Sequence, residues 1–531
     1  MSATPPTAAS GLPPFADARG CKDWLNALPM GNIPQAQTLV LEALRGLDGA
    51  GFAGIERLKC LELMRDKIAF LQGEQRTRYF GKTLPLSTND ANAWATGRAL
   101  LEEMERGYRR CAAQGDASAH AALVAQRIVR SIGAQMLFHA IVYRRFDAAQ
   151  WARLHQEFAG AEAAGVAQER VKDSLEGEEG ASNVTEAYAH VVLMQAAFLS
   201  EVTAPKMDFI GALLKPWARK VRVLAPPGEG TAKSDPLVVD LEKPIGARPQ
   251  ARSELQPGQR IIDTASLSMS IRKRIHGLQH GEDPVTLGLP AEAGGVHALT
   301  ELQRLHKLWC EGAAPRPAPK AAAQPKAGVV LGIGEACFFL TGGKVFEQPD
   351  RKRELTSQEK QDIEVFGRVT ERTQSKMVAE HNYTLESWAV VDELLGAVRV
   401  LRPATTSRGV AIGRLACLRL GDGAPFYLGV VSELVQETDG RIVVTISLLP
   451  GKPEALAVRT GDARSRAGAH WVQGLRLPPL EKLKIPRSLI VPSALAARGR
   501  TLEVWEKGAP VETTVEDVLE RGADFDRLAI P

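Results

Sequence analysis

The chain has little net charge, no long apolar run and no clustered cysteines. Its 66 Lys and Arg residues nearly balance its 62 Asp and Glu residues, so the net charge is +4 over 531 residues. Such a balance argues against binding to a nucleic-acid polymer or a membrane surface. No segment reaches the roughly 18 apolar residues that a membrane span needs, and the first twenty residues lack the charged start and apolar core of a signal peptide. The six cysteines include no CxxC pair. These features predict a cytoplasmic globular protein of two to four domains without a disulfide framework.

Enzyme signatures are also missing. The sequence holds no GxxxxGK[ST], GxSxG or HExxH motif, and no GxGxxG follows an expected strand. Gly332 and Gly334 lack the third glycine of a phosphate-binding loop, so a turn is expected there. His276 and His280 are four residues apart with Glu282 close behind, but no third ligand of a metal site is evident. The sequence therefore predicts neither a catalytic site nor a metal site.

The first part of the chain has the periodicity of helices. Residues 34–47, 55–80 and 91–113 place apolar side chains at intervals of three and four. Thr88 or Asn89 is the expected N-cap of the third of these helices. We expect residues 1–20 to be a disordered lead-in and residues 21–220 to form an α-helical domain. Trp151, Leu154, Phe158 and Ala161 match the start of a tetratricopeptide-like hairpin, but no second copy follows, so a helical bundle and a helix-hairpin repeat both stay open.

The middle of the chain mixes the two patterns. Residues 220–225 and 236–244 are short β-branched runs between turn sequences, residues 260–281 read as a strand followed by a helix, and residues 296–310 form another helical pattern. We expect a mixed α/β region over residues 221–312, although its strands could also belong to a second barrel reaching residue 350. An Ala/Pro/Lys tract at residues 313–327 is expected to be a linker.

The last part of the chain is predicted to be mostly strand, so residues 328–531 should form a third structural region. Short apolar runs separated by tight-turn sequences are typical of a β-sandwich or barrel. A hairpin is expected at Lys507-Gly508 and a final short helix over residues 515–528. Strands are expected at residues 328–333, 336–343, 387–393, 397–403, 414–420, 426–434, 441–450, 487–492 and 501–517.

Arginines gather at the start of this region. Arg368 and Arg372 are four residues apart, and residues 396–420 contain five arginines but no lysine and no acidic residue. Guanidinium groups offer paired donors to phosphate and can stack on bases, so this choice of arginine indicates anion recognition. The competing interpretation places Arg368 and Arg372 on the solvated face of a helix that continues from residue 357, paired with nearby glutamates.

This part of the chain resembles the PilZ domain, which binds the bacterial second messenger cyclic di-GMP. The shared features are an RxxxR pair, a spacer of about twenty residues and a barrel strand with an Asp. The signature of that family is RxxxR followed by [D/N]xSxxG. Arg368 and Arg372 match its first part and Asp392 the head of its second part, whereas Leu394 replaces the serine and Ala397 the glycine. The resemblance covers about residues 366–478 and implies a PilZ-like antiparallel β-barrel of six or seven strands.

The resemblance also implies a function. By this resemblance, Arg368 and Arg372 would grip the phosphates or guanine edges of cyclic di-GMP, and Asp392 would read a base edge. Arg399 and Arg402 are the next candidate contacts. The whole would be a multidomain α+β bacterial regulatory protein, not an enzyme, that needs no cofactor. Its helical domain would pass the signal to a protein partner in motility, pilus or biofilm control. The alternative is a ligand-free scaffold that acts through protein contacts of the helical domain.

Overall fold

The computed structural model of the chain divides into two compact units, Met1–Pro315 and Arg316–Pro531. Each unit is described by itself. The structure describes residues 11–176, 180–226, 235–294, 297–312, 320–321, 323, 325–350, 357–366, 383–405, 408–461, 470–495 and 497–531.

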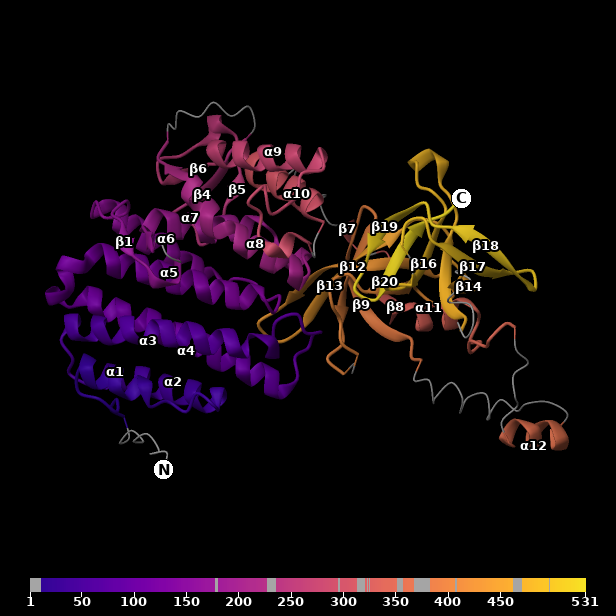
Figure 1. Cartoon of the computed structure of the whole chain (residues 1–531), viewed down its shortest axis with the longest axis horizontal. Helices are drawn as coiled ribbons and strands as arrows, with labels where there is room; N and C mark the ends of the chain where they lie inside the picture. The colour runs from indigo at the N-terminus through magenta and orange to yellow at the C-terminus, as the bar shows by residue number, and fades with distance from the viewer. Residues whose placement is uncertain are drawn as a thin grey trace. The chain divides into compact units, whose positions relative to one another are not determined.

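Within its described residues the first unit opens with a run of α-helices packed side by side (Figure 1). A short hairpin of β1 (Val171–Lys172) and β2 (Ala181–Ser182) interrupts the run. The helices are α1 (Ala18–Asn26), α2 (Ile33–Gly49), α3 (Gly54–Gln75), α4 (Thr88–Ala113), α5 (Ala121–Ala140), α6 (Ala148–Ala163), α7 (Val184–Ala196) and α8 (Ala204–Trp217).

Local sequence sets where several of these helices begin. Asp17, Asn32, Ser87, Asp147 and Asn183 each accept a hydrogen bond from a backbone N–H of the first turn of their helix, which satisfies a donor without a partner inside the helix. The cap of α4 is therefore Ser87, one residue before the predicted Thr88. These five helix starts follow directly from a short polar side chain at the N-cap position.

The tetratricopeptide-like stretch forms the single helix α6. Its four pattern residues are all buried, from 0 % exposed at Leu154 to 5 % at Trp151. The Phe158 ring stacks on Tyr188 of α7 with the centroids 4.1 Å apart. The spacing thus marks the core face of one helix of the bundle. In the part of the chain that the structure describes, no helix is both long and apolar enough to cross a membrane.

The middle region belongs to the first unit. An open sheet with the strand order β3-β6-β4-β5 carries two helices. Trp309 of α10 is 1 % exposed, and its indole N–H donates to the Leu193 carbonyl of α7 at 2.9 Å. This contact fixes the middle region on the helical run. The elements are β3 (Arg222–Leu224), β4 (Leu237–Asp240), β5 (Arg248–Pro249), β6 (Gln259–Asp263), α9 (Ala265–Gln279) and α10 (Ala298–Cys310).

The second unit contains a closed barrel of six strands. The strands pair in the order β10-β13-β12-β11-β8-β9, and β9 pairs back with β10 and closes the ring. The short β7 (Lys320–Ala321) adds to β9. Closure removes the unpaired edges that an open sheet exposes. The barrel strands are β8 (Lys326–Leu331), β9 (Glu386–Leu394), β10 (Ala397–Arg402), β11 (Leu415–Leu420), β12 (Tyr427–Gln436) and β13 (Ile442–Leu449).

A second sheet of this unit is open, with the order β18-β17-β14-β15-β16-β20-β19. The predicted hairpin at Lys507-Gly508 joins its strands β17 and β18 and is confirmed. The expected α+β architecture, a helical N-terminal region followed by a barrel, is confirmed as a whole. The strands are β14 (Glu454–Thr460), β15 (Val472–Leu477), β16 (Ser488–Pro492), β17 (Thr501–Glu506), β18 (Ala509–Thr514), β19 (Asp517–Arg521) and β20 (Phe525–Ala529).

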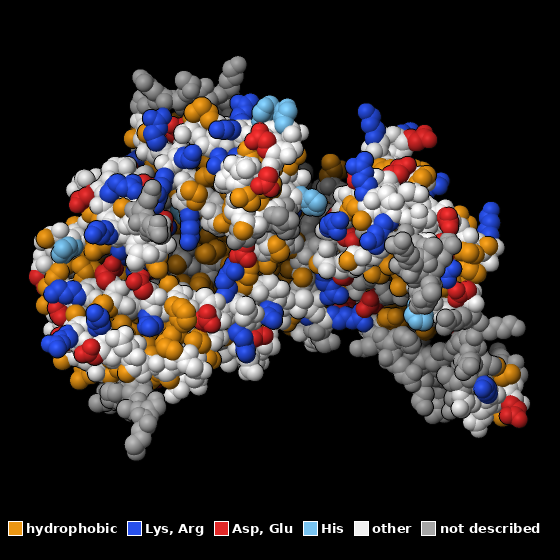
Figure 2. All heavy atoms as spheres, in the orientation of Figure 1, with side chains coloured by type: hydrophobic (Ala, Val, Ile, Leu, Met, Phe, Trp, Pro, Cys, Tyr) orange, Lys and Arg blue, Asp and Glu red, His pale blue; other side chains and the backbone are white. Residues whose placement is uncertain are grey.

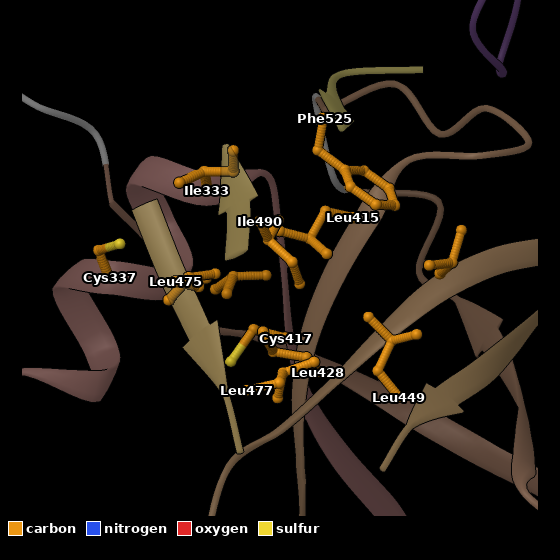
Figure 3. Packing of buried hydrophobic residues seen from close by; sticks show 13 residues of the cluster. Ile333, Cys337, Leu415, Cys417, Leu428, Leu449, Leu475, Leu477, Ile490 and Phe525 are labelled. Atoms are coloured by element: carbon orange, nitrogen blue, oxygen red, sulfur yellow. The ribbon is translucent and has the colours of Figure 1, made fainter. Parts of the chain in front are cut away.

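One apolar core joins the barrel to the open sheet (Figure 3). Cys417 and Leu428 of the barrel meet Leu475 and Ile490 of the open sheet, and all four are fully buried. Helix α11 (Ile333–Leu340) contributes Cys337 from the side. The barrel and the open sheet are therefore packed as one folding unit, because neither could bury this apolar surface alone.

Two predicted elements of this unit are wrong. The apolar stretch at residues 336–343 was expected as a strand but belongs mainly to α11, which begins after Gly332 in a positive-φ conformation (φ 102°). Residues 515–528 were expected as a helix but form β19 and most of β20, which pair with each other. Helix α12 (Ser357–Phe366) ends before the arginine pair, and its predicted continuation to Arg372 lies outside the described residues.

Candidate functional site

The site predicted from sequence lies only partly within the described residues. Arg368 and Arg372 lie outside the described residues, in the stretch that runs into β9 at Glu386. Asp392 lies near the end of β9, and Arg399 of β10 stands directly opposite in the strand register. The structure therefore brings two of the five predicted residues together on neighbouring strands.

Asp392 and Arg399 form an ion pair on the outside of the barrel. The Arg399 Nη1 atom donates to Asp392 Oδ2 at 3.0 Å, and its Nη2 atom lies 3.7 Å from Glu433 Oε2 of β12. Thr445 of β13 donates its hydroxyl to the same Glu433 oxygen at 2.9 Å. We call Asp392, Arg399, Thr445 and Glu433 the polar row. It crosses four neighbouring strands and holds the Asp392 carboxylate in a fixed place.

One oxygen of that carboxylate has no hydrogen-bond partner among the described residues. Asp392 Oδ1 is buried and accepts no hydrogen bond from the described residues, although the side chain as a whole is 15 % exposed. An acceptor left without a donor in a buried position costs roughly 1–3 kcal/mol. A bound molecule with an N–H group would satisfy it.

Arg402 points the other way. Side chains alternate along a strand, so Arg402 shares the interior face of β10 with Val398 and Val400, and all three are buried. Its guanidinium donates to the carbonyl of Arg408 at 2.9 Å and to that of Pro403 at 3.3 Å, and burial lowers its pKa. Arg402 therefore ties the loop after β10 to the end of the barrel and does not join Arg399.

The remaining arginines of the run meet acidic residues from elsewhere in the second unit. Arg408 pairs with Glu335 of α11 at 2.7 Å, and Arg414 lies 3.3 Å from Asp524. Arg419 lies 3.6 Å from Asp422, and its guanidinium stands 5.4 Å from the Phe426 ring centroid. These arginines thus pair in the folded unit with acidic residues that lie outside residues 396–420 in the sequence.

A recess beside β9 was not predicted. It has a volume of about 450 Å³ and lies among the first residues of β8 and β9 and the end of β11. Its charged lining includes Lys326, Glu386, Arg419 and Asp422. Leu385 also lines it and is close in sequence to the stretch that carries Arg368 and Arg372. The signal that could have found it was Lys326, a lone cation at the start of a β-branched run.

His276 in the last turn of α9 and the C-cap residue His280 lie next to each other. The rings of His276 and His280 lie 4.1 Å apart, and His280 Nδ1 is 2.8 Å from the carbonyl oxygen of His276. Over the described ranges, no three His, Cys, Asp or Glu side chains gather where they could hold a metal ion.

Fold and site together define a multidomain α+β protein whose C-terminal barrel presents a row of charged and polar side chains. Residues 19–227 match the family model described as cyclic-di-GMP receptor FimW, N-terminal domain. The match covers α1 to β3, less than half of the chain, and supports a place among cyclic di-GMP effectors. No curated protein and no solved structure shows significant similarity to the chain.

Proposed function

We propose that this protein is a cytoplasmic regulatory effector that binds cyclic di-GMP through its barrel, as a PilZ-like domain would. The observation that carries the proposal is the match of residues 19–227 to a domain of a cyclic di-GMP receptor. The closed six-strand barrel, whose strand β9 follows the RxxxR pair in the sequence, adds independent support. In this function the protein senses a ligand and catalyses no reaction.

Arg368 and Arg372 grip the anionic part of the ligand in this proposal. A guanidinium gives paired donors to a phosphate and also stacks on a base. Cyclic di-GMP carries two phosphates and two guanines, so each of the two arginines, four residues apart in the sequence, would have a phosphate or a guanine to contact. Lys326 and Arg419 are further cations in the recess beside β9, where Glu386 and Asp422 also lie.

Asp392 reads the guanine edge, and Arg399 is its positioning residue. Guanine presents two N–H donors on one edge, and the free Asp392 Oδ1 is an acceptor held beside the outer face of the barrel. The ion pair with Arg399 keeps the other oxygen engaged, so the carboxylate does not have to be reoriented on binding. Arg402 contributes by fixing the loop after β10.

The helical unit then passes the signal to a protein partner in motility, pilus or biofilm control. The alternative function is a ligand-free scaffold. One observation favours it, because all five arginines between residues 396 and 420 meet acceptors inside their own unit. The two functions differ in a single measurable property, the affinity for cyclic di-GMP.

Calorimetric titration with cyclic di-GMP separates the two. We expect the unchanged chain to bind with micromolar or tighter affinity and the Arg368→Ala, Arg372→Ala double variant to bind at least ~100-fold more weakly, because each charge-assisted contact contributes about 1.5–3 kcal/mol. The matched control is the Arg351→Ala, Arg353→Ala double variant, which removes the same charge from the segment that precedes β9 in the sequence. The absence of heat with the unchanged chain would establish the scaffold instead.

A further inference from the structure

The helical unit contains a cavity that the proposed function does not use. It has a volume of about 420 Å³ and lies among α3, α4, α5, α7 and α8. Figure 2 shows the surface hollowed over α5 and α8, with hydrophobic side chains inside the hollow. The volume falls within the range of small-molecule sites. The site is therefore large enough for a ligand of moderate size.

One end of the cavity is basic. Arg65 of α3, Arg130 of α5, His190 of α7 and Lys215 of α8 all line it, together with the acidic Glu176. Burial lowers the pKa of Arg130, and the charge of Arg65 adds to this effect against the charges of Glu176 and Asp173. Arg130 and Lys215 both act on His190. Burial and these two positive charges lower the pKa of His190 to about 3. The histidine is thus neutral at pH 7 and able to donate an N–H without adding charge.

The basic end of the cavity contains a hydrogen-bond donor without an acceptor among the described residues. Arg130 is paired with Glu176, and Arg65 with Asp173. The Arg65 Nη1 atom is nevertheless buried without a hydrogen-bond partner, on a side chain that is only 11 % exposed. In the described part of the unit, no carboxylate lies within ion-pair distance of Lys215. Unsatisfied donors that surround a cavity are complementary to an anion.

The rest of the lining is mostly apolar, with Gln72, Tyr108 and Ser131 as further polar residues. Met104, Val191 and Met194 line it and are buried, and Leu137 and Leu175 at its rim are 38 % and 39 % exposed. Methionine side chains adapt to ligands of irregular shape. Ala134 of α5, also in the lining, leaves space where a larger residue would fill the site.

We infer that this cavity binds a free single-chain anionic amphiphile, such as a fatty carboxylate. The carboxylate would lie against Arg65, Lys215 and His190, and the hydrocarbon chain would lie among Met104, Val191 and Met194. A cyclic dinucleotide fits this environment poorly, because the apolar part of the lining offers few partners for the polar edges of two guanines. The helical unit would then respond to an amphiphile as a second ligand of the protein.

The test uses the full chain and dodecanoate below its critical micelle concentration, followed by calorimetry. We expect saturable binding of one molecule per chain. Lys215→Met should weaken it roughly tenfold, because it removes the cation but keeps the apolar stem. Ala134→Phe should abolish it by filling the cavity, with circular dichroism to verify that the fold is retained. Lys67→Met removes a cation of α3 that does not line the cavity and should leave the affinity unchanged.

Four results would overturn the inference. Dodecanoate binding that does not saturate would be one. Equal affinity for dodecyltrimethylammonium would show that the charge of the head group is irrelevant. Displacement of dodecanoate by cyclic di-GMP would assign the cavity to the nucleotide. Co-sedimentation with phosphatidylglycerol vesicles that Ala134→Phe abolishes would assign it to a membrane lipid.

Discussion

Replacing Asp173 with alanine is expected to lower the free energy of unfolding of the helical unit by about 3–5 kcal/mol, the usual cost of breaking a buried ion network by removing one partner. The Asp173 carboxylate is fully buried and pairs with Arg65 and with Arg127 Nη1, 3.5 Å away. Gln126 donates to it at 2.8 Å. Arg127 is itself only 3 % exposed, so the variant would leave a buried cation with less compensation. Urea denaturation measures the loss, and Asp23→Ala on the exposed face of α1 is the control.

The same carboxylate gives this unit a pH dependence of known sign. Burial opposes ionisation of Asp173, but Arg65 and Arg127 more than offset it and lower the pKa from its ordinary 3.8 to about 2. Because the pKa is lowered in the folded state, the stabilisation is complete above the ordinary value and is lost as the pH falls towards 2. The loss amounts to about 2 kcal/mol. Asp173→Asn should be less stable than the unchanged chain at neutral pH, and the gap should narrow in acid. A gap that is constant across this range would contradict the assignment.

Phe525→Ala is expected to destabilise the second unit by about 3–5 kcal/mol, as large-to-small changes in a well-packed core do. Phe525 is fully buried in the core that joins the barrel to the open sheet (Figure 3). The neighbouring turn also holds the two sheets together, since Asp524 Oδ1 accepts the Leu415 backbone N–H at 2.9 Å and the Ala523 N–H donates to the Gly413 carbonyl at 2.7 Å. The cavity left by the ring would thus open at the junction of the two sheets.

Pulse proteolysis in urea, with peptides assigned to each unit by mass spectrometry, measures this effect. The method reports the unfolding of the two units separately, which a single spectroscopic signal would not do in a chain with two folding units. Leu395→Ala is the matched control, because that side chain is 92 % exposed at the β9–β10 turn. A loss of stability confined to the first unit would contradict the packing described here.

Much of the fold follows from local sequence. Asp147 and Gln150 form a capping box at the start of α6, and Val398 and Val400 alternate with outward residues along β10. Such periodicity and capping chemistry are short-range features. They sufficed to predict the helical region, the strand-rich region and the hairpin at Lys507-Gly508, whereas the choice of a barrel over a sandwich came from the resemblance to PilZ domains.

The two elements that were predicted wrongly depend on long-range contacts, which the local sequence does not reveal. The apolar residues of α11 could form a buried strand or a buried helix, and a short run does not decide between them. Residues 515–528 have apolar spacing compatible with a helix, but their backbone pairs within the open sheet, where β20 also pairs with β16. Tertiary context overrode local preference in both segments.

The candidate site was likewise predictable where local sequence carried the signal and not where long-range contacts did. The arginine run was evident from composition, and the resemblance to PilZ domains singled out Asp392. The partners were not evident, because Glu433 and Glu335 lie far from Arg399 and Arg408 in sequence and meet them only through strand pairing and helix packing. The roles of Arg368, Arg372, Asp392, Arg399 and Arg402 in binding stay predictions that variants must test.

Photochemical cross-linking of labelled cyclic di-GMP to the full chain, followed by peptide mapping, tests the central claim most directly, because it locates the nucleotide on the sequence. The account predicts label on peptides within residues 367–402, which include β9 and β10, and its loss in the Arg368→Ala, Arg372→Ala variant and in the presence of excess unlabelled ligand. Label confined to residues 19–227 would contradict it, since the nucleotide would then bind to the helical unit and not to the barrel.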